Sequence, residues 1–273
     1  MYKLLLACLI LFLLSCQKEV EPNQVDDQRQ NSNCKLQVSR THNIFGALLG
    51  DSAIYYYKGN DVHKITGGDP ADSVVFEYSG RNIIKRRHIS SGVLIGYDDL
   101  FYNNDGTIKK IITYNEDLGT GGIELYDSTV FSYSGGKISK RNYYCIDLQG
   151  PGLILEEENQ FVFSGNNITK EIRFRYNSSG GIDQRDTSIL EYDSQPNLLK
   201  KQAFPHLQAN PMFLDSFAYY LAFLLSENNV ISGMISDDPS SKELFTYVKD
   251  AKGNVVQINA DGIALLSYKY SCP

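Results

Sequence analysis

The sequence of 273 residues has no tryptophan and only four histidines. His42, His63, His88 and His206 are scattered, without the spacing that metal ligands need. The chain also lacks a Gly-x-Ser-x-Gly elbow, a His-Glu-x-x-His motif and a P-loop. No motif therefore supports a hydrolase, a metal-dependent enzyme or a nucleotide-using enzyme. We expect no catalytic site, no metal and no cofactor.

Positive charge is also scarce. Lysine and arginine number 26 against 32 aspartates and glutamates, which gives a net charge of −6. No stretch of the chain forms the basic patch through which proteins neutralise phosphates. We therefore expect no nucleic-acid partner.

Long apolar runs are limited to Leu4–Leu14 and Phe217–Leu225. The first run follows Lys3 and is shorter than the roughly 20 residues that cross a bilayer, so it predicts a signal peptide over residues 1–15. Leu13-Leu14-Ser15-Cys16 resembles a bacterial lipobox, which implies lipidation of Cys16. An ordinary signal peptide with an incidental cysteine is the alternative.

The residues after Cys16 predict the location. Gln17-Lys18-Glu19 resembles the short export signal of surface lipoproteins in the Bacteroidota. Residues 16–33 hold almost no apolar side chains, which predicts a flexible tether before one domain at 34–273. We expect an outer-membrane lipoprotein, held in the membrane by its N-terminal lipid, on the cell surface or the periplasmic face.

Three further cysteines belong to the predicted domain, in a compartment that would be oxidising. Cys34 opens the domain and Cys272 is the penultimate residue, so a disulfide between them would tie the two ends. The alternative is two thiols that happen to frame the domain. Cys145, in Tyr143-Tyr144-Cys145-Ile146, predicts a buried strand thiol.

The chain is rich in the residues that build hairpins, with 19 tyrosines, 13 phenylalanines and 22 glycines. In 127–140, DSTVFSYSGGKISK, an aromatic strand runs into a Gly-Gly turn, and related segments surround Gly59, Gly80 and Gly165. Glycine at the first central position suits a type II′ turn. The resulting register places an aromatic residue opposite a β-branched one, then a second aromatic residue opposite a lysine.

This register predicts individual pairs. Tyr133 should face Ile138, and Phe131 should face Lys140. The same rule pairs Tyr78 with Ile83, Phe76 with Lys85, Phe163 with Ile168, Phe161 with Lys170, Tyr57 with Val62 and Tyr55 with Lys64. Three-residue loops extend it to Tyr102 with Ile108, Leu100 with Lys110, Tyr192 with Leu198 and Leu190 with Lys200.

Together these patterns predict an all-β fold. A first strand at Cys34–Ser39 precedes hairpins at 52–66, 72–89, 97–114, 127–146, 158–176 and 186–203, and further strands lie at Val230–Ile235, Glu243–Lys249, Asn254–Asn259 and Leu265–Tyr270. About sixteen strands in one antiparallel meander should form a large curled sheet, a roll or an open barrel. A short helix-containing insertion is expected near 205–229. A membrane-spanning barrel is less favoured, because both faces carry charge.

One strand alternates clearly. Ile168, Lys170, Ile172, Phe174 and Tyr176 should share one face, and Thr169, Glu171, Arg173 and Arg175 the other. Such alternation predicts a sheet with one dry face and one wet face.

Two motifs carry a family resemblance. Tyr102-Asn103-Asn104-Asp105-Gly106 and the recurring Tyr-x-Gly-x-x-Ile-x-Lys resemble YD-type β-hairpin repeats. Asn210-Pro211-Met212-Phe213, with Ser226-Glu227-Asn228-Asn229, resembles an insertion in uncharacterised hairpin-rich lipoproteins of the Bacteroidota. The resemblance covers nearly the whole mature chain and implies a fold and a compartment, but no active site.

Few residues suggest chemistry. Carboxylates cluster at Asp26-Asp27, Asp98-Asp99, Glu156-Glu157-Glu158 and Asp237-Asp238, where surface loop charge is the simplest interpretation. Ser52, Ser73 and Ser128 each follow an aspartate at a strand entry. These positions resemble Bacteroidota O-glycosylation sites, although turn chemistry explains them too.

The leading functional expectation is a tethered binding or interaction module whose partner is a glycan or an envelope protein. The alternatives are a structural envelope lipoprotein without a ligand and, least supported, a hydrolase.

Overall fold

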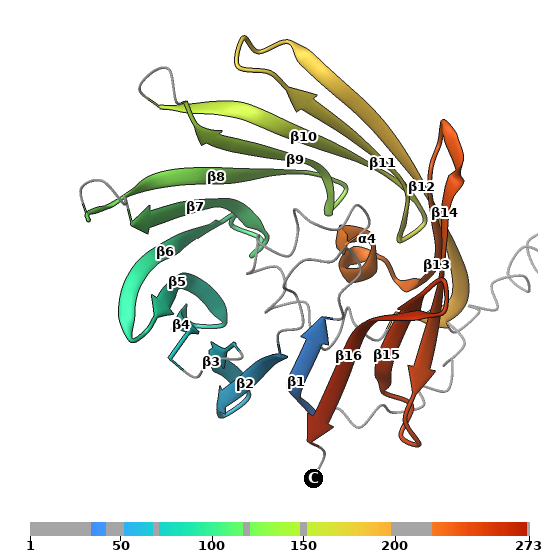
Figure 1. The fold of residues 1–273 in the computed structure, drawn as a ribbon, viewed down its shortest axis with the longest axis horizontal. Helices are drawn as coiled ribbons and strands as arrows, with labels where there is room; N and C mark the ends of the chain where they lie inside the picture. Colours follow the sequence, from blue (N-terminus) through green and yellow to red (C-terminus); the bar gives the residue numbers. More distant parts are fainter. Residues whose placement is uncertain are drawn as a thin grey trace, which may run out of the picture. The chain divides into compact units, whose positions relative to one another are not determined.

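The computed structural model describes residues 34–41, 52–67, 71–116, 121–147, 152–197 and 220–271. In these ranges the chain forms sixteen strands and one short helix. All sixteen strands join one closed antiparallel barrel in chain order, and β16 returns to pair with β1 (Figure 1). The elements are β1 (Lys35–Thr41), β2 (Ser52–Lys58), β3 (Asp61–Thr66), β4 (Ser73–Ser79), β5 (Asn82–Ser90), β6 (Val93–Tyr102), β7 (Ile108–Glu116), β8 (Ile123–Ser134), β9 (Lys137–Ile146), β10 (Leu153–Ser164), β11 (Asn167–Tyr176), β12 (Ile182–Pro196), α4 (Tyr220–Leu225), β13 (Asn228–Ile235), β14 (Asp238–Lys249), β15 (Val255–Ala260) and β16 (Ile263–Ser271).

The all-β antiparallel meander is confirmed, but the prediction of an open roll is wrong. The first and last strands pair directly, from Lys35 opposite Ser271 to Thr41 opposite Leu266. This pairing satisfies two rows of backbone groups that an open sheet would leave exposed. Because strand twist accumulates across a sheet, a meander this long curls until its edges can meet.

The helix α4 lies inside the ring of strands, next to β11 and β13 (Figure 1). It belongs to the segment near 205–229, of which residues up to 219 lie outside the described part of the chain. Ala222 and Phe223 are buried, and Phe223 packs edge-to-face on Phe245 with ring centroids 4.9 Å apart. Glu227 follows α4 and donates its backbone N–H to the carbonyl of Asn166. The helix therefore fills the interior beside the 165–166 turn.

The predicted hairpin register is confirmed next to the turns. Tyr133 faces Ile138, and the same contact recurs as Tyr78 with Ile83, Phe163 with Ile168, Tyr57 with Val62 and Tyr102 with Ile108. Gly165 has φ +56° at the first turn position, the left-handed conformation that this turn needs. At Gly135 and Gly136 both φ values are positive, as in a type I′ turn.

The predicted aromatic–lysine pairs are wrong, because a β-bulge follows each first pair. Phe131 faces Arg141 rather than Lys140, and Phe161 faces Glu171 rather than Lys170. The shifts recur in the other hairpins, where Phe76 faces Arg86, Tyr55 faces Ile65 and Leu100 faces Ile111. The extra residue turns each lysine to the outer wall and turns the residue after it to the interior.

The bulge also overturns the predicted faces of β11. Ile168 is fully buried in the interior, and Glu171 is also buried although it was expected on the opposite face. Because the sheet alternates after the bulge, Arg173 faces the interior with Glu171, and Phe174 lies on the outer wall. The charged row of this strand therefore lines the inside of the barrel.

The last predicted hairpin is wrong for a different reason. Tyr192 pairs with Val230 and Leu190 with Gly233, so β12 pairs with β13 rather than with the segment that follows it. Residues 198–200, the expected partners, lie outside the described residues. The insertion separates two strands that are neighbours in the sheet.

A ring of tyrosine hydroxyls links successive hairpins at the end of the barrel that carries the 59–60, 80–81, 135–136 and 165–166 turns. Each hydroxyl donates to a backbone carbonyl of a neighbouring hairpin or terminal strand, in the pairs Tyr57–Leu36, Tyr78–Val62, Tyr102–Ile83, Tyr133–Ile108, Tyr192–Ile168, Tyr247–Val230 and Tyr270–Val255. Burial raises the pKa of the phenols, to about 12 for Tyr78, so they remain neutral donors. The ring ties adjacent hairpins together beyond their backbone ladders.

Phe163 occupies the equivalent position in its own hairpin but has no hydroxyl. Lys137 Nζ lies 5.4 Å from its ring centre, as Lys35 Nζ lies 5.2 Å from the ring of Tyr57, so a phenol is compatible with the lysine. Phe163→Tyr should stabilise the barrel by about 0.5–1 kcal/mol through a new bond to the Ile138 carbonyl. Tyr133→Phe is the matched reverse change and should destabilise by a similar amount. Urea unfolding of both variants checks this, and a destabilised Phe163→Tyr would contradict it.

Candidate functional site

The position two residues after the bulge of the repeated hairpin carries the charged residues of the interior. This position is isoleucine in two hairpins, Ile65 and Ile111, and is charged in three others, Arg86, Arg141 and Glu171. All five side chains face the same interior surface, which elsewhere is lined by the apolar core. Charged residues at a core position mark two polar clusters inside the barrel.

The first cluster is formed by Arg86 and His88 of β5 and Asp98 of β6. Arg86 and Asp98 are each only 1% exposed, and Nε of Arg86 lies 3.0 Å from Oδ2 of Asp98. Nε2 of His88 lies 2.5 Å from the same oxygen. Burial alone would raise the pKa of Asp98, but the His88 hydrogen bond and the Arg86 charge lower it overall. Asp98 is thus a buried carboxylate held ionised by two basic partners.

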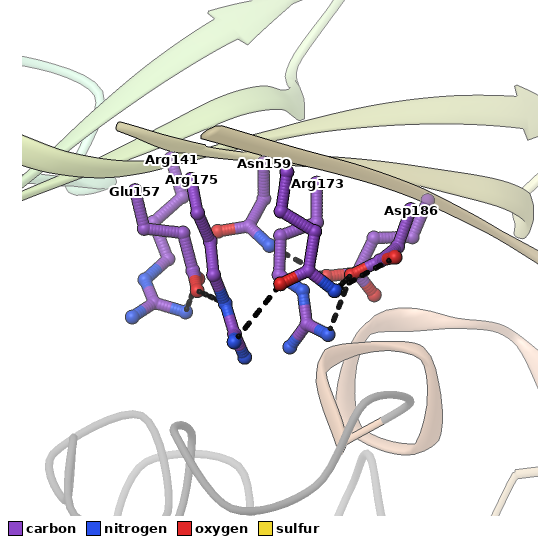
Figure 2. Close-up of polar contacts among 8 residues, drawn as sticks. Arg141, Glu157, Asn159, Arg173, Arg175 and Asp186 are labelled. Carbon is purple, nitrogen blue, oxygen red and sulfur yellow. Dashed lines mark hydrogen bonds and ion pairs between the residues drawn. The ribbon is translucent and has the colours of Figure 1, made fainter. Parts of the chain in front are cut away.

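The second cluster spans β9 to β12, and its side chains point from the strands toward the interior (Figure 2). Glu157 lies between two arginines, 3.7 Å from Nη1 of Arg141 and 3.9 Å from Nε of Arg175. Arg173 pairs with Asp186 at 3.1 Å. Opposite charges alternate across four neighbouring strands, so the cluster is nearly neutral.

Glu171 is the most deeply buried acid of this cluster. Asn159 Nδ2 donates to its Oε1 at 2.9 Å. Burial raises the pKa of Glu171 to about 7, although Arg141 and Arg173 oppose the rise. Oδ1 of Asn159 is buried without a hydrogen-bond partner among the described residues. A protonated Glu171 can supply the donor that this oxygen lacks.

A cavity of about 540 Å³ opens beside the second cluster, at the opposite end of the barrel from the 135–136 and 165–166 turns. It is lined by Tyr126, Tyr143, Cys145, Ile146, Glu156, Glu157 and Arg175. We call it the rim pocket. Its walls combine aromatic rings, carboxylates and a guanidinium, which are the groups that bind polar organic molecules.

Two lining residues reach the rim pocket because of β-bulges. Tyr126 is the unpaired extra residue between Asp127, which faces Thr113, and Leu125, which faces Tyr114. Glu156 is the corresponding extra residue on β10. It lies between Leu155, which faces Tyr144, and Glu157, which faces Tyr143. Bulges redirect side chains and are frequent beside functional sites. Their convergence from β8 and β10 makes the rim pocket the candidate binding site.

Cys145 lies on β9 between these two bulges and is a free thiol. Burial, together with the hydrogen bond to the Glu156 carboxylate and the charge of that group, raises the pKa of the Cys145 thiol to about 11. The group is therefore a protonated thiol that donates to Glu156, and not a nucleophilic thiolate. The predicted strand thiol is located on a strand, but it lines a pocket rather than a closed core.

The outer wall of the barrel mixes apolar residues with ion pairs. Lys85 and Asp99 lie 3.0 Å apart, and Lys140 and Glu158 lie 2.8 Å apart. Both pairs join neighbouring strands. Exposed apolar side chains, such as Phe101 and Val162, lie among them.

The structure places the predicted carboxylate clusters on strands. Asp98 and Asp99 belong to β6, where alternation turns the first inward and the second outward. Glu156, Glu157 and Glu158 belong to β10, with Glu158 only 9% exposed. Surface loop charge is therefore wrong for these two clusters. Asp237 lies in a turn, as the sequence suggested.

The other predicted site residues remain untested. Cys16 and Cys272 lie outside the described residues. Cys34 is disulfide-bonded and directly precedes β1. The Cys34–Cys272 pairing stays a prediction.

All three predicted O-glycosylation positions lie on strands, two at a strand start and one, Ser128, inside β8. Ser52 begins β2 and Ser73 begins β4, where Ser73 is buried. Ser128 is 2% exposed and donates to the carbonyl of Ile111 at 3.2 Å. Glycosylation of these residues stays a prediction, and at Ser128 it would have to precede folding.

No group of three histidine, cysteine, aspartate or glutamate side chains is placed to hold a metal ion in the described part of the chain. No helix among the described residues is both long and apolar enough to cross a membrane.

Comparison with known proteins identifies similar structures but no family. No family model matches the chain, and no curated protein matches it. A porin-like protein from Bacteroides vulgatus is similar, with a TM-score of 0.56 and 14% identity over 87% of this chain and 99% of that one. A porin-like protein from Bacteroides uniformis has a TM-score of 0.52 and 12% identity over 88% of this chain and 97% of that one. At these identities the likeness shows the shared barrel fold.

Proposed function

We propose that this protein is a lipid-anchored envelope protein that binds a saccharide in the rim pocket. The observation that carries the proposal is the convergence of two bulge residues, Tyr126 and Glu156, on one cavity of about 540 Å³. Tyrosine rings can stack on the apolar face of a sugar ring, while carboxylates and a guanidinium bind its hydroxyls. A cavity of this size fits a small ligand or one end of a chain.

The anchor is part of the proposal. The lipobox-like Leu13-Leu14-Ser15-Cys16 would fix the mature chain in the outer membrane, and residues 17–33 would act as the tether. Fractionation of cells that produce Cys16→Ala tests this part, since the variant should leave the membrane fraction.

A transmembrane pore is the function that the name of the two similar structures suggests. The charged side chains of the outer wall make a transmembrane pore unfavourable. Lys85, Asp99, Lys140 and Glu158 would face lipid. Charged residues on the lipid face of a barrel cost about 2–4 kcal/mol each near the bilayer midplane. A barrel built to sit beside the membrane, in water, fits this surface better.

The test is calorimetric titration of the mature chain with a panel of neutral and charged oligosaccharides. We expect binding of at least one class, and Tyr126→Ala should weaken it about five- to tenfold, because the ring loses its stacking contact. Tyr56→Ala is the matched control. Both tyrosines are 47% exposed, but Tyr56 lies on the outer wall of β2, away from the pocket. An unchanged affinity in Tyr126→Ala, or no binding by any saccharide, would refute the assignment and favour a structural role.

A further inference from the structure

The rim pocket contains one carboxylate without a cationic partner. Glu157 is balanced by Arg141 and Arg175, which lie 3.7 and 3.9 Å from its oxygens. Glu156 also lines the pocket, but no lysine or arginine of the described residues forms an ion pair with it. Its neighbour is the neutral thiol of Cys145. The pocket therefore carries an uncompensated negative charge at Glu156.

The aromatic walls complement that charge. The guanidinium of Arg141 lies over the ring of Tyr143, 5.9 Å from its centre, so this ring already has a cation beside it. No cation of the described residues lies over the ring of Tyr126, which is 47% exposed. A ring face beside an unpaired carboxylate attracts a cation, because the ring quadrupole and the carboxylate act in the same direction.

We propose that the saccharide bound in the rim pocket carries a protonated amine, which binds Glu156 and lies against Tyr126. This inference rests on the proposed function and specifies its ligand class. The amine would give Glu156 the charge-assisted bond that the protein does not provide. Hydroxyl groups of the same sugar would reach Glu157 and Arg175.

The same charges exclude acidic sugars. A uronate carboxylate would meet two glutamates. Arg175, the one cation that lines the pocket among the described residues, already pairs with Glu157. Like charges in a partly enclosed cavity repel more strongly than they would in open water. The expected order of affinity is therefore amino sugar, then neutral sugar, then acidic sugar.

The experiment compares two oligomers of equal length, a glucosamine trimer and its fully N-acetylated counterpart, at about pH 6, where the sugar amine is protonated. Calorimetry on the mature chain should give about fivefold tighter binding of the amine form, the difference between a charge-assisted and a neutral hydrogen bond. Glu156→Gln should bring the ratio of the two affinities close to one. Because Glu156 is an exposed bulge residue, the variant should fold, which its thermal unfolding curve would confirm.

The control is Glu77→Gln, which removes a carboxylate from the outer wall, where Glu77 pairs with Arg87. This variant should keep the fivefold ratio. Equal binding of the two trimers by the unaltered protein, or a ratio that survives Glu156→Gln, would overturn the inference while leaving saccharide binding intact. Failure of every sugar to bind would instead overturn the proposed function and, with it, this inference.

Discussion

Replacing Arg86 by methionine should destabilise the barrel by about 3–5 kcal/mol, the largest loss we expect from any single substitution. Arg86 and Asp98 are each 1% exposed, and the substitution would leave the Asp98 carboxylate buried with His88 as its remaining basic partner. A buried carboxylate that loses its arginine must either remain incompletely compensated or take up a proton, and both outcomes cost stability. Urea unfolding at pH 7 measures the loss.

The neighbouring residue provides the control. Arg87 lies on the outer wall, 49% exposed, and pairs with Glu77. Arg87→Met should cost no more than about 1 kcal/mol, because exposed ion pairs contribute little. Equal losses at positions 86 and 87 would contradict our account. The double variant Arg86→Met/Asp98→Leu should recover much of the stability, since two apolar side chains leave no buried charge.

The second large effect should be a dependence of stability on pH that is set by Glu171. Its folded pKa of about 7 lies above the ordinary glutamate value of 4.5. The folded state therefore binds a proton that the unfolded state releases, so this residue's stabilising contribution is complete below about pH 4.5 and is lost as pH rises to 7. The loss across that window should be about 3 kcal/mol.

Glu171→Gln removes this dependence. Glutamine keeps the oxygen that accepts from Asn159 and adds a donor for Asn159 Oδ1, which is buried without a partner among the described residues. The variant should resemble the unaltered protein near pH 4.5 and exceed it in stability near pH 8. Unfolding free energies at several pH values between these limits would show the two curves diverging. Parallel curves would mean that Glu171 is ionised throughout.

Much of the fold could be predicted, because it follows from local chemistry. The glycine turns, and the aromatic residue opposite a β-branched one beside each turn, as in Tyr133 and Ile138, predicted where the hairpins lie and in what order. The bulge after each pair could not be predicted from alternation alone, since alternation assumes that no residue is skipped. Aligning the hairpins on Ile-x-Lys would have exposed it, because the next residue is Ile65, Arg86, Ile111, Arg141 or Glu171. A core position that varies between isoleucine and charge indicates an interior with polar clusters.

The rim pocket was less accessible to sequence reasoning. Tyr126 and Glu156 are 30 residues apart and carry no motif. They converge only because β8, β9 and β10 are adjacent and the strands on both sides of β9 bulge near Cys145. His88 and Asp98 were also missed as a pair, because their contact depends on the register of β5 against β6. In each case the missing information was which strands bulge and where.

The way the barrel closes also sets the order in which it can form. Every pair of neighbouring strands except one is consecutive in the chain, and apart from β12–β13, which the insertion separates, hairpins can nucleate independently and extend by short loop closures. The exception joins β1 to β16, and its ends are separated by nearly the whole domain. Loop-closure entropy grows with the logarithm of that separation, so this contact gains little until the intervening strands have curled. The β1–β16 contact should therefore be the last strand pairing of the barrel to form.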